Sequence, residues 1–97
     1  MPMYIVLGKF TDQGIKDIRN LRQRVQENMQ RGEQLGMKPH GWYLTMGRYD
    51  FVVLVEAPDD ETAATQVLGV ASRGASRPET LRAFTLDEAD AIIQKMS

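Results

Sequence analysis

The sequence predicts an α+β sandwich in which two helices cover one face of a four-stranded antiparallel sheet, with a further helix at the C-terminus. Two observations support this class. Strand-like and helix-like apolar periods follow one another in the order β-α-β-β-α-β, and a short turn joins the two middle strands as a hairpin. Because 97 residues suit one compact domain, we expect residues 1–97 to form a single domain.

The first two elements are a strand and a long helix. Residues 3–7 are apolar at both odd and even positions, which is typical of a strand covered on both faces. Apolar residues then recur three or four positions apart, at Ile15, Ile18, Leu21, Val25 and Met29. This spacing predicts an amphipathic helix of about twenty residues. Thr11 or Asp12 would cap its start, and Gly36 would end it.

The middle of the chain predicts a hairpin, with strands at residues 42–46 and 51–55 around the turn Gly47, Arg48, Tyr49 and Asp50. A two-residue loop at positions 47 and 48 would pair Met46 with Tyr49, Leu44 with Phe51 and Trp42 with Val53. These pairs would make one face apolar at Trp42, Leu44, Phe51 and Val53, and the other would carry Tyr43, Thr45, Asp50, Val52 and Leu54. A longer loop would shift the register and exchange the faces.

The C-terminal third supplies the remaining elements. Acidic residues at positions 59–61 favour a helix start, and an apolar stripe at Ala63, Ala64, Val67, Leu68 and Ala71 continues it. Residues 72–76 predict a loop and residues 80–84 a fourth strand. Thr85 and Glu88 fit a capping box that opens a terminal helix. This order of elements is that of the ferredoxin-like, split β-α-β arrangement.

The predicted sheet is too apolar for a single layer of helices. Both faces of the first strand and much of the second face of the hairpin are apolar, and soluble monomers rarely expose large contiguous apolar patches. We therefore expect a homodimer whose sheets cover each other, or a larger homo-oligomer. The alternative is that the terminal helix folds back over the open face of its own chain.

Composition excludes several classes of function. A formal charge of -1 supplies no basic excess for nucleic acid, and the absence of Cys excludes disulfides and thiolate metal sites. No apolar run is long enough to span a membrane, so we expect a cytoplasmic protein with neither membrane nor nucleic-acid partners. No nucleotide-binding or metal-hydrolase motif is present. We expect no cofactor and no metal.

Four segments taken in order, residues 4–14, 47–53, 56–63 and 80–85, resemble the GYD-domain family and together run almost the length of the chain. The turn from Gly47 to Asp50 alone is weak evidence, because similar turns occur in the effector-binding domains of Lrp/AsnC-type regulators. The resemblance implies the dimeric α/β-barrel fold and dimerisation. It carries no established activity with it.

His40 and Asp50 are the candidate catalytic residues. In a regular strand the single histidine, His40, lies on the same side as Trp42, although Pro39 and Gly41 could bulge the strand and turn it. Asp50 beside a tight turn usually accepts hydrogen bonds from backbone amides, and its alternative is to point into a cavity as an acceptor or weak base.

Arginines gather around the last strand, at Arg73, Arg77 and Arg82, close to the rim of a cavity in this fold. Arg82 would either hold a carboxylate or carbonyl of a ligand or form a salt bridge with Glu79 or Glu56.

Three functions remain open. The favoured hypothesis is a homodimeric module that binds a small apolar or aromatic molecule between sheet and helices, with Tyr43, Thr45, Asp50 and Arg82 orienting it. The second is a cofactor-independent monooxygenase or isomerase that uses His40 or Asp50, by analogy with other dimeric barrels. The third is a purely structural oligomerisation domain.

Overall fold

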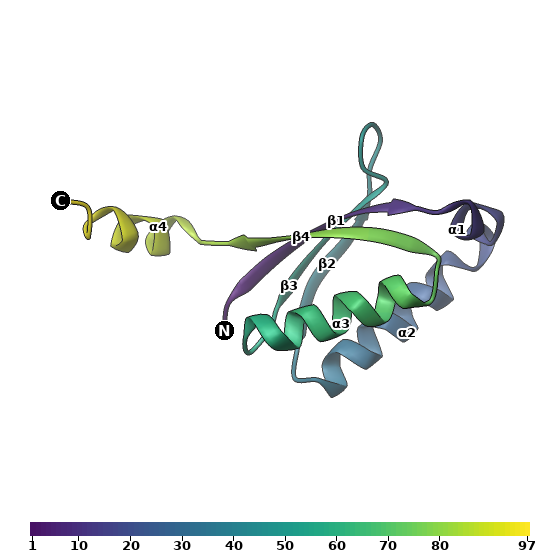
Figure 1. Ribbon diagram of the computed structural model, residues 1–97, viewed down its shortest axis with the longest axis horizontal. Helices are drawn as coiled ribbons and strands as arrows, with labels where there is room; N and C mark the ends of the chain where they lie inside the picture. The colour runs from purple at the N-terminus through teal and green to yellow at the C-terminus, as the bar shows by residue number, and fades with distance from the viewer.

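The computed structural model describes residues 1–97 and has the predicted ferredoxin-like α+β arrangement (Figure 1). The elements are β1 (Met3–Phe10), α1 (Asp12–Lys16), the 3-10 turn η1 (Ile18–Asn20), α2 (Leu21–Gln34), β2 (Lys38–Leu44), β3 (Phe51–Glu56), α3 (Asp60–Ser72), β4 (Ser76–Ala83) and α4 (Leu86–Ile93). The sheet is antiparallel with strand order β2-β3-β1-β4. Helices α2 and α3 lie on the same side of it.

The two faces of the sheet differ in what covers them, because side chains alternate along each strand. One face is turned toward α2 and α3 and carries Tyr4, Val6, Trp42, Phe51, Val53, Val55 and Thr80. The opposite face, here called the open face, carries Met3, Ile5, Leu7, Tyr43, Val52, Leu54 and Leu81. On the open face Tyr43 is 55% exposed and Leu81 is 42% exposed. The chain therefore leaves an apolar sheet surface uncovered.

The hairpin has the predicted register over most of its length. Leu44 pairs with Phe51 and Trp42 with Val53, as expected, and Trp42, Phe51 and Val53 face the helices. The predicted pair of Met46 with Tyr49 is wrong, because β2 ends at Leu44 and the loop is longer than two residues. Met46 is 96% exposed in that loop.

The first predicted helix is interrupted. Its start is capped by Thr11 as expected, and the backbone turns at Gly36 with a positive φ of 84° after α2 has ended. Between them the chain leaves the α-helical path at Asp17, whose φ and ψ are -103° and 25°. The Asp17 carboxylate accepts hydrogen bonds from Asn20 and Arg24. Asp and Asn compete with helical hydrogen bonding in this way, which explains the break.

The elements of the C-terminal third also depart from their predicted extents. Asp59 caps α3 through the Thr62 amide, but Leu68, placed in its buried stripe, is 69% exposed. Strand β4 begins at Ser76 rather than at residue 80, since it continues pairing with β1 as far as Phe10.

Helix α4 extends away from the rest of the molecule. The predicted capping box of Thr85 and Glu88 is present at its start. The helix continues beyond the end of β4, away from α2 and α3, and does not fold back over the open face (Figure 1). That alternative is wrong for this chain. Apolar side chains of the extension remain exposed, namely Phe84, Leu86, Ile92, Ile93 and Met96.

The packed core is small. It is a cluster of Tyr4, Met37, Val55, Ala57 and Ala63, located where the C-terminal end of α2 and the N-terminal end of α3 meet the sheet. The Tyr4 hydroxyl donates a hydrogen bond to Asp60 at the start of α3. Burial, followed by this hydrogen bond, raises the pKa of Tyr4. None of the helices has the length and the apolar run that a bilayer crossing requires.

Gly14 provides a test of how α1 is held against the loop before β4. A Cβ at Gly14 would lie 2.0 Å from the carbonyl oxygen of Ala75, which also accepts the Thr11 amide. The backbone at Ala75 cannot move aside for the added Cβ as the end of a flexible side chain could. We expect Gly14→Ala to lower the free energy of unfolding by about 2 kcal/mol, although alanine favours helices.

Gly69 is the matched control in α3. A Cβ there meets only the end of the Arg73 side chain, at 3.8 Å. We expect Gly69→Ala to raise the free energy of unfolding by about 0.5–1 kcal/mol. Urea titrations followed by circular dichroism would measure both, and two changes of the same sign would contradict the account of Gly14.

Candidate functional site

A cavity of about 260 Å³ lies between the sheet and the helices α2 and α3. Its floor comes from β1 and β3, with Val6, Val53 and Val55. Its walls come from the helices, with Val25 and Met29 of α2 and Val67 and Val70 of α3. The cavity is close in size to the smaller ligand pockets of proteins, about 300 Å³, and has their mainly apolar lining.

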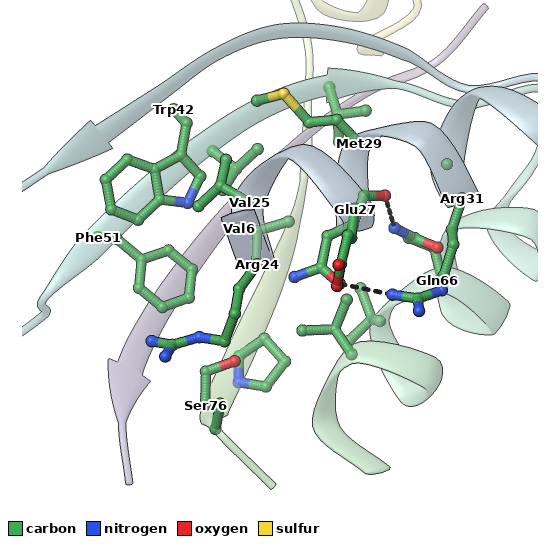
Figure 2. A pocket seen from close by; sticks show the side chains of 18 of the residues that line it. Val6, Arg24, Val25, Glu27, Met29, Arg31, Trp42, Phe51, Gln66 and Ser76 are labelled. Atoms are coloured by element: carbon green, nitrogen blue, oxygen red, sulfur yellow. Dashed lines mark hydrogen bonds between the residues drawn. The ribbon is translucent and has the colours of Figure 1, made fainter. Parts of the chain in front are cut away.

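Stacked aromatic rings form one side of the cavity. The rings of Trp42 and Phe51 lie 5.5 Å apart and are tilted by only 15°, and Phe10 packs on Phe51 at 5.4 Å. Figure 2 shows Trp42 and Phe51 together beside Val25. Gly8 makes this arrangement possible, because a Cβ there would lie 1.9 Å from the Phe51 ring. The absence of a side chain at Gly8 therefore sets the position of the aromatic wall formed by the rings of Trp42 and Phe51.

Polar side chains from both helices form the opposite side. Arg73 Nη2 donates to Asn28 Oδ1 at 3.0 Å, and Arg31 Nη1 reaches the same oxygen at 3.5 Å. Gln66 Nε2 donates to the Asn28 carbonyl at 2.7 Å. Burial and the nearby Arg31 charge lower the pKa of Arg73, while Glu27 opposes them. Two guanidinium groups thus converge on one neutral oxygen at this side of the cavity.

Two further polar residues line the cavity near its aromatic side. Arg24 extends beside Phe51 (Figure 2) and forms an ion pair with Asp17 at 3.1 Å. Ser76, at the start of β4, is only 6% exposed and also lines the cavity. The Arg24 charge is already matched by a carboxylate, unlike those of Arg31 and Arg73, which form no ion pair within the chain.

His40 lies away from this cavity. The strand bulges between Pro39 and Gly41, so the expectation that His40 shares the side of Trp42 is wrong. Its Nε2 lies 2.8 Å from Glu56 Oε2. Glu56 alternates with Val55, which lines the cavity, and therefore belongs to the open face. The alternative prediction, a bulge around His40, is therefore the correct one.

Asp50 and Thr45 make backbone contacts in the hairpin loop. Asp50 Oδ2 accepts the amide of Phe10 at 2.9 Å, and Thr45 Oγ1 donates to the Tyr49 carbonyl at 2.7 Å. The Tyr49 hydroxyl donates to Glu79 Oε2 at 2.5 Å, and this hydrogen bond is the main cause that raises the pKa of Tyr49. These contacts fasten the hairpin loop to β1 and β4.

The structure does not bring the four predicted ligand residues together around the cavity. Tyr43 lies on the open face, whereas Arg82 lies over the ring of Phe84 at 4.3 Å and lines a separate open groove with Tyr4 and Asp60. The salt bridge of Arg82 with Glu79 or Glu56 is absent, since its guanidinium donates to backbone carbonyls. Ligand contact by Tyr43, Thr45, Asp50 and Arg82 stays a prediction.

Sequence reasoning found Arg73 near a cavity rim but missed its partners on α2. A signal was present, because Asn28 interrupts the apolar stripe that Val25 and Met29 continue. A polar residue at a stripe position indicates that this part of the helix face is not purely a packing surface. Recognising this interruption of the stripe was the step needed to predict the cavity residues Asn28, Arg31 and Gln66.

The fold is shared with proteins of known structure. The crystal structure of MtbAldR (Rv2779c) is similar over 87% of the chain, with a TM-score of 0.66 at 16% identity. The chain spans about half, 52%, of that protein. TTHA0845 from Thermus thermophilus is similar over 88% of the chain and 95% of its own length, with a TM-score of 0.56 and 29% identity. The class is a small ferredoxin-like α+β domain.

The chain belongs to the GYD domain family, whose model matches residues 4–93. A curated relative from Thermus thermophilus is 38% identical over 87% of this chain and 90% of its own length. That relative is named "Glutamine synthetase and cystathionine beta-lyase binding protein".

The contact between His40 and Glu56 predicts a pH dependence. The hydrogen bond from His40 is the main cause that lowers the pKa of Glu56. A carboxyl with a lowered pKa in the folded state stabilises the fold above its unfolded pKa, and this stability is lost as pH falls through the folded pKa. We expect His40→Ala to raise the pKa of Glu56 and to make stability less sensitive to pH in that acidic range.

Carbon-13 NMR titration of the carboxyl groups would measure the pKa of Glu56 in both proteins. Asp59 serves as the internal control, because its lowered pKa comes from hydrogen bonds with Thr62 and should not change. An unchanged pKa of Glu56 in the variant would contradict the assignment.

Proposed function

We propose that the protein is a homodimeric module that binds a small, largely apolar molecule in the cavity between the sheet and the helices. The observation that supports this most is the cavity itself. Its lining is mainly apolar, with an aromatic pair on one side and polar side chains on the other, which is the usual composition of a small-molecule site. An apolar occupant would remove this lining from water, which is favourable by about 25 cal/mol for each Å² of apolar surface buried.

The dimer in this proposal is supported by two uncovered apolar surfaces. The open face of the sheet has no layer over it, and α4 exposes Leu86, Ile92 and Ile93. A helix as short as the eight residues of α4 is marginal in water without packing. A second copy laid on the open face would cover the sheet and give the extensions surfaces to pack on. Any ligand contact by Tyr43 would then occur at the dimer interface.

The catalytic alternative gains no support from geometry. His40 is engaged with Glu56, Asp50 is engaged with the Phe10 amide, and neither lines the cavity. A general base needs to reach the substrate directly or through one water.

A second candidate is a module that binds other proteins. It is favoured by the name of the curated relative, which describes binding to glutamine synthetase and cystathionine β-lyase. In this candidate the exposed extension around α4 would contact an enzyme rather than a second copy. Both candidates place a protein on the uncovered apolar surfaces. In the first candidate it is a second copy of this chain, and in the second it is an enzyme.

Trp42 makes the binding proposal directly testable, because it is the only tryptophan and lines the cavity. We expect a small neutral aromatic molecule such as benzyl alcohol to change Trp42 fluorescence saturably. Val25→Phe, which fills space beside Trp42, should weaken that binding at least tenfold. Met46→Phe is the matched control, since Met46 is 96% exposed, and should bind normally. Equal binding by all three proteins would place the probe outside the cavity.

Sedimentation equilibrium tests the assembly. We expect a particle of twice the 11.0 kDa chain mass at micromolar concentration. Leu81→Lys, on the open face, should give a folded monomer because a buried charge opposes the contact. Leu68→Lys, on α3 rather than on the open face and with Leu68 69% exposed, is the control and should remain dimeric.

A monomeric parent chain would reject the dimer. Repeating the run with purified glutamine synthetase or cystathionine β-lyase addresses the second candidate. Co-sedimentation of a monomeric parent chain with either enzyme would favour it.

A further inference from the structure

We propose that the ligand of the cavity is a small monocarboxylic acid with an apolar body, whose carboxylate is bound by Arg31 and Arg73. This inference rests on the proposed function and narrows it to one chemical class. It depends on how charge is arranged at the polar side of the cavity.

The two arginines lack an anionic partner of their own. The ion pairs within the chain are Arg24 with Asp17 and His40 with Glu56, so neither Arg31 nor Arg73 has a carboxylate within 4.0 Å. Both instead direct a nitrogen at Asn28 Oδ1, at 3.5 and 3.0 Å. A neutral amide oxygen thus occupies the place where two adjacent cations would favour an anion.

The charges at this side of the cavity leave one positive charge over. Arg31 and Arg73 contribute two positive charges, and Glu27, which acts on Arg73 electrostatically, contributes one negative charge. Burial and mutual repulsion already lower the pKa of Arg73, so an added anion relieves an unfavourable arrangement. A single carboxylate balances the site, and a dianion would exceed it.

The rest of the cavity selects an apolar body. Figure 2 shows Trp42 and Phe51 on one side, Arg31 and Gln66 on the other, and Val25 and Met29 between them. The aromatic pair offers flat surfaces and the helices offer branched apolar side chains. A molecule with a ring or branched chain at one end and a carboxylate at the other matches both sides at once.

The experiment compares acids with their neutral amides. Phenylacetate, 3-phenylpropanoate and 4-methylpentanoate, each paired with its amide, would be titrated by isothermal calorimetry and by Trp42 fluorescence. We expect the best acid to bind at least tenfold more tightly than its amide, which corresponds to about 1.4 kcal/mol.

Variants separate the carboxylate from the cavity. Arg73→Met and Arg31→Gln should each weaken the acid about tenfold and leave the amide unchanged, and Arg48→Met in the exposed hairpin loop should change neither. Circular dichroism would establish that each variant is folded, and either arginine variant alone suffices for the test.

The outcomes distinguish this inference from the proposed function. Acid and amide binding equally, with both blocked by Val25→Phe, would overturn the carboxylate inference and keep the cavity as a binding site. An acid preference that persists in both arginine variants would also overturn it. No binding of any acid or amide would remove the proposed function together with this inference.

Discussion

The contact between the helices and the sheet is fastened at its two ends and left open between them, and the cavity follows from this. At one end the small core around Tyr4, Val55 and Ala63 joins the sheet to the start of α3. At the other end Gly14 lies against the Ala75 carbonyl, which accepts the Thr11 amide. Between these ends α2 presents the polar Asn28 to the cavity, where a large apolar side chain would have filled part of the space. The helices therefore span the gap without closing it.

The hairpin turn from Gly47 to Asp50 acts on the cavity indirectly. Asp50 accepts the Phe10 amide, and its own amide donates to the Gly8 carbonyl, so the hairpin loop is fixed to the end of β1. Gly8 in turn leaves room for the Phe51 ring, which stacks with Trp42. The polar residues of the turn thus hold the rings of Phe51 and Trp42 in place without lining the cavity themselves, which explains why the residues conspicuous in the sequence differ from those that line the cavity.

The sequence predicts those features of the fold that residues close together in the chain determine, such as strand faces, hairpin register and helix caps. Alternation fixed the faces of β3, the Trp42–Val53 register was correct, and the caps at Thr11, Asp59 and Thr85 were visible from residue type. The break at Asp17 was not predicted and the bulge at His40 was predicted only as an alternative, because each depends on a contact made only in the fold. The convergence of Arg31 and Arg73 on Asn28 joins residues 45 positions apart, so no local pattern carries it.

The domain's stability depends on what fills its apolar spaces. Only 10 of 97 residues are buried, few for a chain that must offset the conformational entropy of folding. The cavity and the open face lie on opposite sides of the same strands, since Val53 faces one and its neighbours Val52 and Leu54 face the other. Anything that binds either surface only in the folded state adds stability by mass action, about 2.7 kcal/mol at a hundred times the dissociation constant. A sheet lined by apolar residues on both faces is therefore suited to a protein whose folded state is completed by its partners.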